Sequence, residues 1–291
     1  MMMKKFPKRL AAQFAFFLLQ NPLLNNFASG SIYRGDLKKI CTPGLNCYSC
    51  PAAVTSCPIG SMQLFLAGAK QSVSMAVAGF LLTTGVVFGR FICGYVCPVG
   101  LIQDLLYKIK TPKLNARLRY LKFLKYAVLA LFVFILPFAV RHELSGLGSP
   151  WFCEYICPSG TIFAAFPLMA VNDFLRAMAG VQFLFKAVLA IGIMLVSVVV
   201  FRFFCRVLCP LGAIYSLFNR FAIFRMHCDV GKCVACGKCR EKCLVHIDPA
   251  KQVNSPECIR CGKCVSACNT QALGYRGLPR ATRHNQGDRP L

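Results

Sequence analysis

The sequence predicts a membrane-embedded all-α domain of four transmembrane helices, arranged as a duplicated two-helix unit and followed by a small cysteine-rich α+β domain. Three observations support this fold class. Of the 291 residues, 56% are hydrophobic and only 15% are charged, whereas soluble domains carry about 25% charged residues. The motif Cys-Pro-x-Gly occurs four times along the chain. Eight of the 19 cysteines form two identical runs near the C-terminus.

Composition changes along the chain and divides it into three parts. We expect a membrane domain over residues 1–224, a cysteine-rich domain over 225–275 and a basic, flexible tail over 276–291. A helix needs roughly 20 predominantly apolar residues to cross a bilayer. The four expected spans are 10–28, 72–89, 126–140 and 181–201. The last three fit this requirement well. The first, 10–28, fits less well, and an interfacial helix is its alternative.

Basic residues are distributed unevenly between the loops that these spans would create. With four spans, 27 of the 34 lysines and arginines fall on one side and 7 fall on the other. Lysine and arginine are enriched in cytoplasmic loops. We therefore expect a multi-pass protein of the cytoplasmic (inner) membrane with both termini in the cytoplasm. The formal net charge of +24 follows from these loops, so we expect the membrane, and no nucleic acid, as a partner.

The cysteines near the C-terminus show the spacing C-x2-C-x2-C-x3-C twice. Bacterial ferredoxins with two 4Fe-4S clusters have this spacing, and the fourth cysteine of each run binds the other cluster. Gly237 and Gly262 lie inside the loops, where the chain needs unusual backbone dihedrals. We predict a two-cluster ferredoxin-like domain, with two zinc sites as the alternative, and interpret Cys228 as a bystander thiol. One cluster takes Cys233, Cys236, Cys239 and Cys268, and the other takes Cys258, Cys261, Cys264 and Cys243.

Two further cysteine pairs follow apolar stretches, in RFICGYVCPVG and RFFCRVLCPLG. Cysteines four residues apart share one face of a helix, and the proline after the second cysteine places that cysteine at a helix end. Each pair supplies two ligands, whereas a cubic cluster or a tetrahedral metal takes four. The expected topology puts both pairs on the cytoplasmic side. We therefore predict one iron–sulfur or iron centre shared by Cys93, Cys97, Cys205 and Cys209.

Six more cysteines lie in the two loops that we expect outside the membrane. The segment CTPGLNCYSCPAAVTSCPIG holds four of them, and the equivalent loop of the second half holds a C-x3-C pair. A further cluster would take its ligands either from the first loop alone or from both loops. Ala53 stands where the repeat would place a partner for Cys57. Disulfides are the alternative on an outer face. The candidates are Cys41, Cys47, Cys50, Cys57, Cys153 and Cys157.

Together, these motifs resemble a known family. RFICGYVCPVG and RFFCRVLCPLG on four spans, followed by paired ferredoxin motifs, are similar to the membrane polyferredoxin-type proteins of periplasmic nitrate reductase operons. They are also similar to the membrane and ferredoxin part of the nitrous oxide reductase regulator. The resemblance covers about residues 72–270. It implies electron transfer between a membrane donor, often a quinol, and other redox subunits, and the outer cysteines extend the pattern toward 4Fe-4S membrane proteins of anaerobes.

Two classes of function stay open at this point. The first is an electron-transfer subunit without catalytic residues, which passes single electrons between a cytoplasmic or quinol donor and a membrane or outer-side redox partner. The second is a membrane protein for redox sensing or metalloenzyme maturation. No expected span contains a histidine, and no Gly-x-Gly-x-x-Gly turn or P-loop is present. Haem held by two histidines in the bilayer and nucleotide chemistry are therefore not expected.

Overall fold

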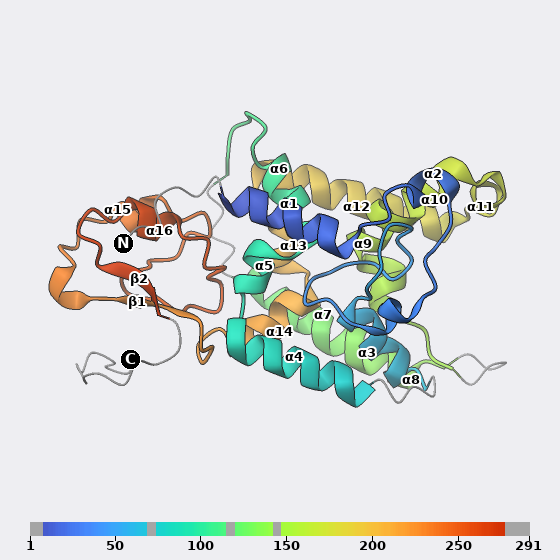
Figure 1. Ribbon diagram of the computed structural model, residues 1–291, viewed down its shortest axis with the longest axis horizontal. Helices are drawn as coiled ribbons and strands as arrows, with labels where there is room; N and C mark the ends of the chain where they lie inside the picture. The colour runs from blue at the N-terminus through green and yellow to red at the C-terminus, as the bar shows by residue number, and fades with distance from the viewer. Residues whose placement is uncertain (1–7, 69–73, 115–119, 142–146, 277–291) are drawn as a thin grey trace.

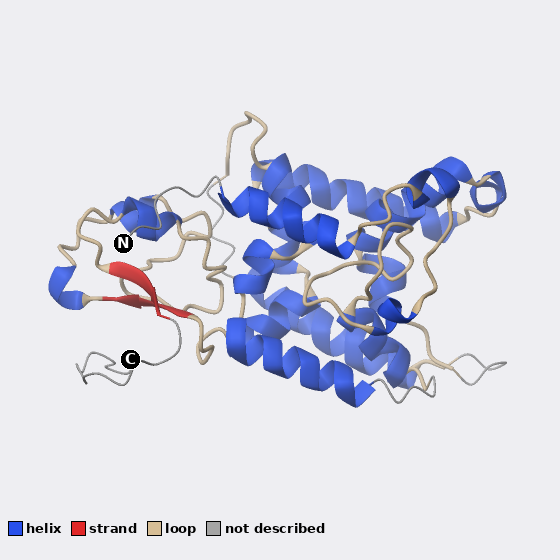
Figure 2. Ribbon diagram, in the orientation of Figure 1, coloured by secondary structure: helices blue, strands red, loops and turns tan. Residues whose placement is uncertain are grey.

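The computed structural model describes residues 8–68, 74–114, 120–141 and 147–276. A helical bundle forms one end of the molecule and a small domain forms the other (Figure 1). Figure 2 shows that the two strands of the described residues both lie in the small domain. In the bundle, the elements η3, η4 and η5 are π-helical. The bundle consists of α1 (Lys8–Gln20), α2 (Asn26–Ser29), η1 (Asp36–Lys39), α3 (Pro58–Leu66), α4 (Ser74–Phe88), α5 (Phe91–Tyr95), α6 (Pro98–Leu106), η2 (Leu121–Phe123), α7 (Leu124–Val128), η3 (Leu129–Ile135), α8 (Leu136–Ala139), η4 (Phe152–Ile156), α9 (Pro158–Gly160), η5 (Thr161–Ala165), α10 (Phe166–Val171), α11 (Asp173–Ala177), α12 (Val181–Val199), α13 (Phe203–Val207) and α14 (Pro210–Phe218).

Two helices of the described residues are long and apolar enough to cross a membrane. They are the continuous helix Leu121–Ala139 and α12, each of 19 residues, and they correspond to the expected spans 126–140 and 181–201. Met75–Phe88 and Pro158–Val171 are apolar but shorter. The start of the expected span 72–89 lies outside the described residues. The four-span arrangement therefore stays a prediction.

The expected span over residues 10–28 is interrupted. α1 ends at Gln20, before Asn21 and Pro22, and the Asn21 side chain donates a hydrogen bond to the Phe17 carbonyl oxygen at 3.0 Å. The 13 residues of α1 measure about 20 Å at 1.5 Å per residue, which is short of the roughly 30 Å of bilayer hydrocarbon. The structure therefore does not show one continuous helix over 10–28, because the Asn-Pro pair ends α1, and the span stays a prediction.

Each Cys-Pro-x-Gly motif begins a new helix. The cysteine is the residue before the helix and has an extended backbone, and the proline occupies the first turn. This confirms that the proline places the second cysteine of each pair at a helix end, since proline lacks the N–H that the first turn leaves unpaired. The four cysteines in this position are Cys57, Cys97, Cys157 and Cys209.

The small domain contains two matched halves between its strands. Gly237 and Gly262 have φ angles of 74° and 78°, so the expected left-handed backbone is confirmed at both glycines. Ala235 and Arg260 also match, with φ angles of 50° and 52°. Of the tail expected over 276–291, only Arg276 lies within the described residues. The elements of the domain are β1 (Arg225–Cys228), η6 (Val230–Lys232), α15 (Lys238–Glu241), α16 (Lys263–Ala267) and β2 (Leu273–Arg276), with β1 antiparallel to β2.

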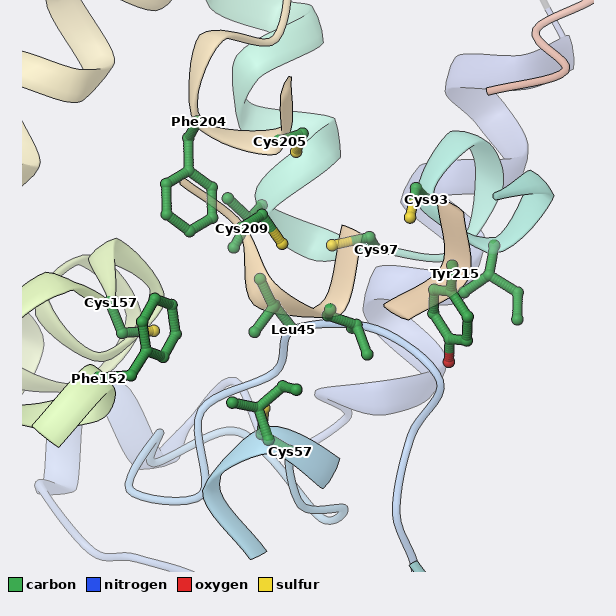
Figure 3. Packing of buried hydrophobic residues seen from close by; sticks show 14 of the residues in the cluster. Leu45, Cys57, Cys93, Cys97, Phe152, Cys157, Phe204, Cys205, Cys209 and Tyr215 are labelled. Atoms are coloured by element: carbon green, nitrogen blue, oxygen red, sulfur yellow. The ribbon is translucent and has the colours of Figure 1, made fainter. Parts of the chain in front are cut away.

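The apolar core of the bundle surrounds the cysteines instead of excluding them. Leu45, Phe152, Phe204 and Tyr215 are at most 1% exposed and belong to the same buried cluster as seven cysteines. A close view of this core shows cysteine sulfurs among these side chains (Figure 3). The fold therefore places the candidate ligands in the least accessible part of the bundle. The seven are Cys50, Cys57, Cys93, Cys97, Cys157, Cys205 and Cys209, and Cys41, Cys47 and Cys153 pack against the cluster at its edge.

Candidate metal centres

The proximal site, as we call it, consists of Cys93, Cys97, Cys205 and Cys209 at the end of the bundle nearest the small domain. Cys93 lies in α5 and Cys205 in α13, while the other two precede α6 and α14. In Figure 3 the sulfurs of Cys97 and Cys209 point toward each other, with Cys93 and Cys205 on either side. All four side chains are 4–6% exposed. The structure therefore brings the two predicted pairs together.

The four thiols of the proximal site lie close enough to affect one another's ionisation. Burial is the largest cause that raises the pKa of the Cys209 thiol, and Cys205, Cys93 and Cys97 raise it further. Burial, Cys97 and Cys93 raise the pKa of Cys205 to about 12. Four thiolates cannot coexist here without positive charge between them. A metal provides that charge and keeps coordinating thiols deprotonated, so the site suits a cationic group with four thiolate ligands.

A single metal ion and a 4Fe-4S cube need different spacings of their four thiols. Among the described residues, no group of three or more cysteine, histidine, aspartate or glutamate side chains is compact enough to hold one metal ion. A tetrahedral zinc site needs its sulfurs about 2.3 Å from the same ion. In a 4Fe-4S cube each thiolate binds a different iron, so the four sulfurs stand further apart.

Two buried arginines join the halves of the proximal site. Arg90 Nη2 donates to the carbonyl oxygen of Cys205 at 3.1 Å. Arg202 Nη1 donates to the carbonyl oxygen of Cys93. Each arginine stands three residues before one cysteine pair and binds the backbone of the other pair. This exchange fixes α5 and α13 relative to each other.

Arg90 shares a buried carboxylate with a second cation. Glu257 of the small domain accepts from Arg90 Nη1 at 3.1 Å and from Lys125 Nζ at 2.5 Å. Burial raises the pKa of Glu257, but Arg90 and Lys125 outweigh this and lower it. Two cations around one carboxylate leave one net positive charge beside the thiols. The same contact ties the small domain to the bundle.

Arg202 belongs to an equivalent group of buried ion pairs in the other half of the proximal site. Asp104 of α6 accepts from Arg202 Nη2 at 2.6 Å and also forms an ion pair with Arg9. Burial raises the pKa of Asp104, but Arg202 and Arg9 outweigh it and lower the pKa to about 2. This group again combines two cations with one carboxylate. Positive charge therefore flanks the proximal site on both halves, where it favours thiolates over thiols.

Gln103 of α6 adds a side-chain donor to the proximal site. Its Nε2 donates to Cys205 Sγ at 3.1 Å, and its Oε1 accepts from the backbone N–H of Phe204 at 3.1 Å. Ser197 Oγ also donates to that oxygen at 3.3 Å. Hydrogen bonds to ligand sulfurs tune the potential of an iron–sulfur cluster. The sequence analysis missed Gln103, although CPIGSMQ and CPVGLIQ both place glutamine six residues after the cysteine.

The small domain packs directly on the proximal site. A Cβ atom at Gly94, next to Cys93, would lie 2.6 Å from the carbonyl oxygen of Ile259. Only glycine permits this approach of the two backbones. Arg206, which takes the place of Gly94 in the second motif, donates to the carbonyl oxygen of Val245 at 3.4 Å. Both halves of the site therefore contact the small domain.

The domain presents one of its two expected ligand sets to the proximal site. Burial raises the pKa of the Cys264 thiol, and Cys261, Cys258 and Cys243 raise it further. These four are the set predicted for one cluster, including the cysteine that crosses over from the first run. Ile259 lies in this loop, so this set is the one that faces the bundle.

The other expected set lies at the more exposed end of the domain. Cys236 is exposed, and Cys233, Cys239 and Cys268 are half-buried. Burial, together with Cys233, Cys239 and Cys268, raises the pKa of Cys228 to about 11. Cys228 therefore lies against this set instead of standing apart from it, a position that its spacing did not predict.

The six cysteines expected outside the membrane separate into two groups. Four of them line one cavity of about 470 Å³: Cys47, Cys57, Cys153 and Cys157. Cys41 and Cys50 do not line this cavity. Cys41 Sγ lies 3.7 Å from Ser56 Oγ, and Cys50 Sγ lies 3.7 Å from Asn21 Oδ1. The structure therefore does not bring all six together.

A family of 4Fe-4S binding domains matches the chain in three places, over residues 71–117, 126–168 and 183–227. Each matched segment contains one C-x3-C-P motif, so the family covers the cysteine pairs of the bundle. This match, with the geometry of the thiols, supports a ferredoxin-like iron–sulfur protein.

Similar proteins extend this assignment. Two uncharacterized proteins of Methanocaldococcus jannaschii are 26% and 28% identical to this chain, over 77% and 75% of it and 80% and 85% of their own lengths. The "Putative electron transport protein YccM" of Escherichia coli is 24% identical over 68% of this chain and 54% of its own length. The methylamine utilization ferredoxin-type protein MauN of Methylobacillus flagellatus is 27% identical over 58% and 52%. No solved structure matches the chain. Two of these relatives thus carry names that refer to electron transport or to a ferredoxin-type protein.

Proposed function

We propose that the chain is a membrane-bound electron-transfer subunit in which the ferredoxin-type domain exchanges single electrons with the proximal site. A 4Fe-4S cluster takes up and releases one electron at a time when it is bound. Cys243, Cys258, Cys261 and Cys264 would hold the cluster that faces the bundle, and the proximal thiols would hold the next one. Other redox subunits, and a quinol at the membrane, are the partners that this arrangement would serve.

The contact between Gly94 and Ile259 carries this proposal. Ile259 adjoins the ligand Cys258, and Gly94 adjoins Cys93, so one backbone contact links ligands of both sites. Glu257, next in the chain, fixes the same loop through its ion pairs with Arg90 and Lys125. A rigid, dry contact of this kind keeps two redox groups at a fixed separation.

Membrane attachment is supported by the outer surface of α12. Its large apolar side chains are 50–85% exposed and recur at helical spacing, so they form one stripe along the helix. An exposed apolar stripe of this size is typical of a surface that meets lipid or another protein. With the excess of basic residues on one side, it supports an inner-membrane protein with both termini in the cytoplasm. The stripe consists of Val181, Leu184, Phe185, Val188, Ile191 and Leu195.

The test uses Gly94→Ala in the full chain. The added methyl group would overlap the Ile259 carbonyl oxygen, so the domain must move away from α5. We expect unchanged iron content, but weaker magnetic coupling between the two reduced centres in electron paramagnetic resonance and slower reduction of the proximal site by a low-potential donor. Gly79→Ala in α4 is the matched control, because a Cβ there meets nothing within 4 Å.

Two outcomes would count against the electron-transfer proposal. Coupling and reduction rate equal to those of the Gly79→Ala control would mean that the contact does not link the two sites. A chain whose centres resist reduction, but whose deletion lowers the metal content of another enzyme, would favour the maturation or redox-sensing function.

A further inference from the structure

The cavity on the far side of the bundle core has the chemistry of a ligand site. Its volume is about 470 Å³, and most of the side chains around it are apolar. Four thiols from three separate segments converge on it: the loop before α3, the start of α3, and the turn from η4 to α9. Apolar walls with a few converging groups of one chemical type are typical of cofactor sites.

We propose that Cys47, Cys57, Cys153 and Cys157 are the ligands of a second iron–sulfur cluster in the bundle, and that Cys41 and Cys50 are not ligands. We call these four thiols the distal site. The inference rests on the proposed iron–sulfur function and deepens it. The family match covers Cys153 and Cys157, but it leaves open which other thiols join them, and the inference assigns Cys47 and Cys57.

The distal site repeats the side-chain contacts of the proximal site. Gln63 Nε2 donates to Cys153 Sγ at 3.3 Å, and Gln63 Oε1 accepts from the backbone N–H of Phe152 at 2.9 Å. At the proximal site, Gln103 makes the same pair of bonds to Cys205 Sγ and to the N–H of the phenylalanine before it. A glutamine in this position therefore binds the first cysteine of a pair in the other half of the bundle.

Two glycines lie beside the distal thiols. A Cβ atom at Gly60 would lie 3.8 Å from Cys153 Sγ, and one at Gly160 would lie 3.7 Å from Cys47 Sγ. Both glycines belong to Cys-Pro-x-Gly motifs and line the cavity, so two of these motifs face the same space.

Cys47 replaces the ligand that the repeat lacks. At the proximal site the fourth thiol stands four residues before the helix-starting cysteine, but Ala53 occupies that place before Cys57. Cys47 comes instead from the preceding loop and lies with Cys57, Cys153 and Cys157 around the cavity. Both of the loops expected outside the membrane therefore contribute thiols to this cavity.

Two lysines supply positive charge at the distal site. Lys186 Nζ donates to the carbonyl oxygen of Cys153 at 2.8 Å, as Arg202 does to that of Cys93. Lys38 is 5% exposed and donates to the carbonyl oxygen of Tyr48, the neighbour of Cys47. Lysines beside thiols favour the thiolate form that a metal requires.

A short segment connects the two sites. Tyr215 Oη donates to the Pro43 carbonyl oxygen at 3.0 Å, and a Cβ atom at Gly44 would lie 3.1 Å from the Cα of Cys97. Three residues later the segment reaches Cys47, and Ser159 Oγ donates to the intervening Leu45 carbonyl oxygen at 3.4 Å. The chain therefore passes from proximal ligand to distal ligand within a few residues.

The experiment measures iron and acid-labile sulfide in the anaerobically purified full chain. Cys47→Ser, Cys57→Ser, Cys153→Ser and Cys157→Ser should each lose about four irons, the content of one cube. The variant that carries all four changes should lose the same number, because the thiols share one site. Cys50→Ser, in the same loop as Cys47, is the matched control and should keep its iron, as should Cys41→Ser.

Thiol labelling of the unchanged chain guards against variants that fail to fold. Mass spectrometry after alkylation should find Cys47, Cys57, Cys153 and Cys157 protected before iron is removed by a chelator and labelled afterwards. An equal loss of iron in Cys47→Ser and Cys50→Ser, a disulfide among these cysteines in the anaerobic protein, or no loss at all would overturn the proposal. If Cys93→Ser loses four irons and Cys47→Ser loses none, only the distal site fails. If neither loses iron, the proposed function fails as well.

Discussion

The proximal and distal sites use one design with different surroundings. In both, a glutamine donates to the sulfur of one cysteine and accepts from the backbone N–H of the residue before it. In both, a basic side chain also donates to a cysteine carbonyl oxygen: Arg202 to that of Cys93, and Lys186 to that of Cys153. The proximal site is enclosed by two groups of buried ion pairs and by the small domain. The distal site has two lysines and opens into a cavity.

This difference shows which parts of a site the local sequence fixes and which parts it leaves to the rest of the fold. Cys-Pro-x-Gly fixes a helix start and a thiol at its end, so it reappears unchanged at both sites. The fourth thiol is not fixed in this way: Cys93 comes from a helix and Cys47 from a loop. The charged surroundings differ most, because they come from residues distant in sequence, such as Glu257.

The largest expected effect concerns a buried carboxylate that, among the described residues, the proximal site has and the distal site lacks. Glu257→Gln leaves Arg90 and Lys125 buried side by side without a carboxylate, and removing one partner of a buried ion pair costs about 3–5 kcal/mol. We expect the free energy of unfolding, measured by denaturant titration, to fall by a comparable amount, because the small domain is held less firmly on the bundle. The distal thiols should remain protected from alkylation.

The control for this change is Asp36→Asn, which removes an exposed ion pair with Lys39. Exposed pairs contribute about 0–1 kcal/mol, so this variant should unfold nearly as the unchanged chain does. Equal losses in both variants would show that the buried carboxylate has no special part in holding the domain.

A smaller effect is expected at the other carboxylate of the proximal site. The pKa of Asp104 is lowered from 3.8 to about 2, and one pKa unit corresponds to about 1.4 kcal/mol. Asp104→Asn should therefore lower the free energy of unfolding by about 2 kcal/mol. A lowered pKa gives stability that is complete above 3.8 and is lost only as the pH falls toward 2. The difference between variant and unchanged chain should thus be constant from about pH 5 to about pH 8, and a difference that changes across this range would contradict the assignment.

The smallest effect tests whether the two glutamines are equivalent. A hydrogen bond to a ligand sulfur stabilises the reduced, more negative centre, so Gln103→Leu should lower the midpoint potential of the proximal site. A bond of about 1 kcal/mol corresponds to a shift on the order of 40 mV for one electron. Gln63→Leu should shift only the distal signal by a similar amount. Redox titration followed by electron paramagnetic resonance measures both potentials. If either variant shifted the signal of the site that its glutamine does not contact, the two glutamines would not be equivalent.

Local spacing predicted much of these sites. The two C-x2-C-x2-C-x3-C runs predicted which cysteines meet in the small domain, because ligand geometry on a tight loop depends on neighbouring residues. The C-x3-C-P pairs likewise predicted that the four proximal thiols belong together. The break in α1 at Gln20 was readable from Asn21 and Pro22, but the apolar composition around them outweighed that signal in the prediction.

The spacing of cysteines along the sequence could not predict long-range contacts. Nothing near Cys47 indicates that it lies with Cys153, because the path of an irregular loop depends on what it packs against. The docking of the small domain by Glu257 joins residues more than a hundred positions apart. Gln63 and Gln103 were an exception. Both stand six residues after a cysteine, so the sequence alone showed the position from which they make their contacts.

The iron content of the intact chain tests the two-site comparison most directly. Two ligand sets in the small domain, the proximal site and the distal site would together hold four cubes, or about sixteen irons and sixteen sulfides per polypeptide. Anaerobic purification followed by iron, sulfide and amino-acid analysis gives this ratio. About sixteen irons is the predicted result. About eight irons, all retained when Cys93, Cys97, Cys205 and Cys209 are replaced by serine, would contradict it and leave the thiols of the bundle core as packing residues.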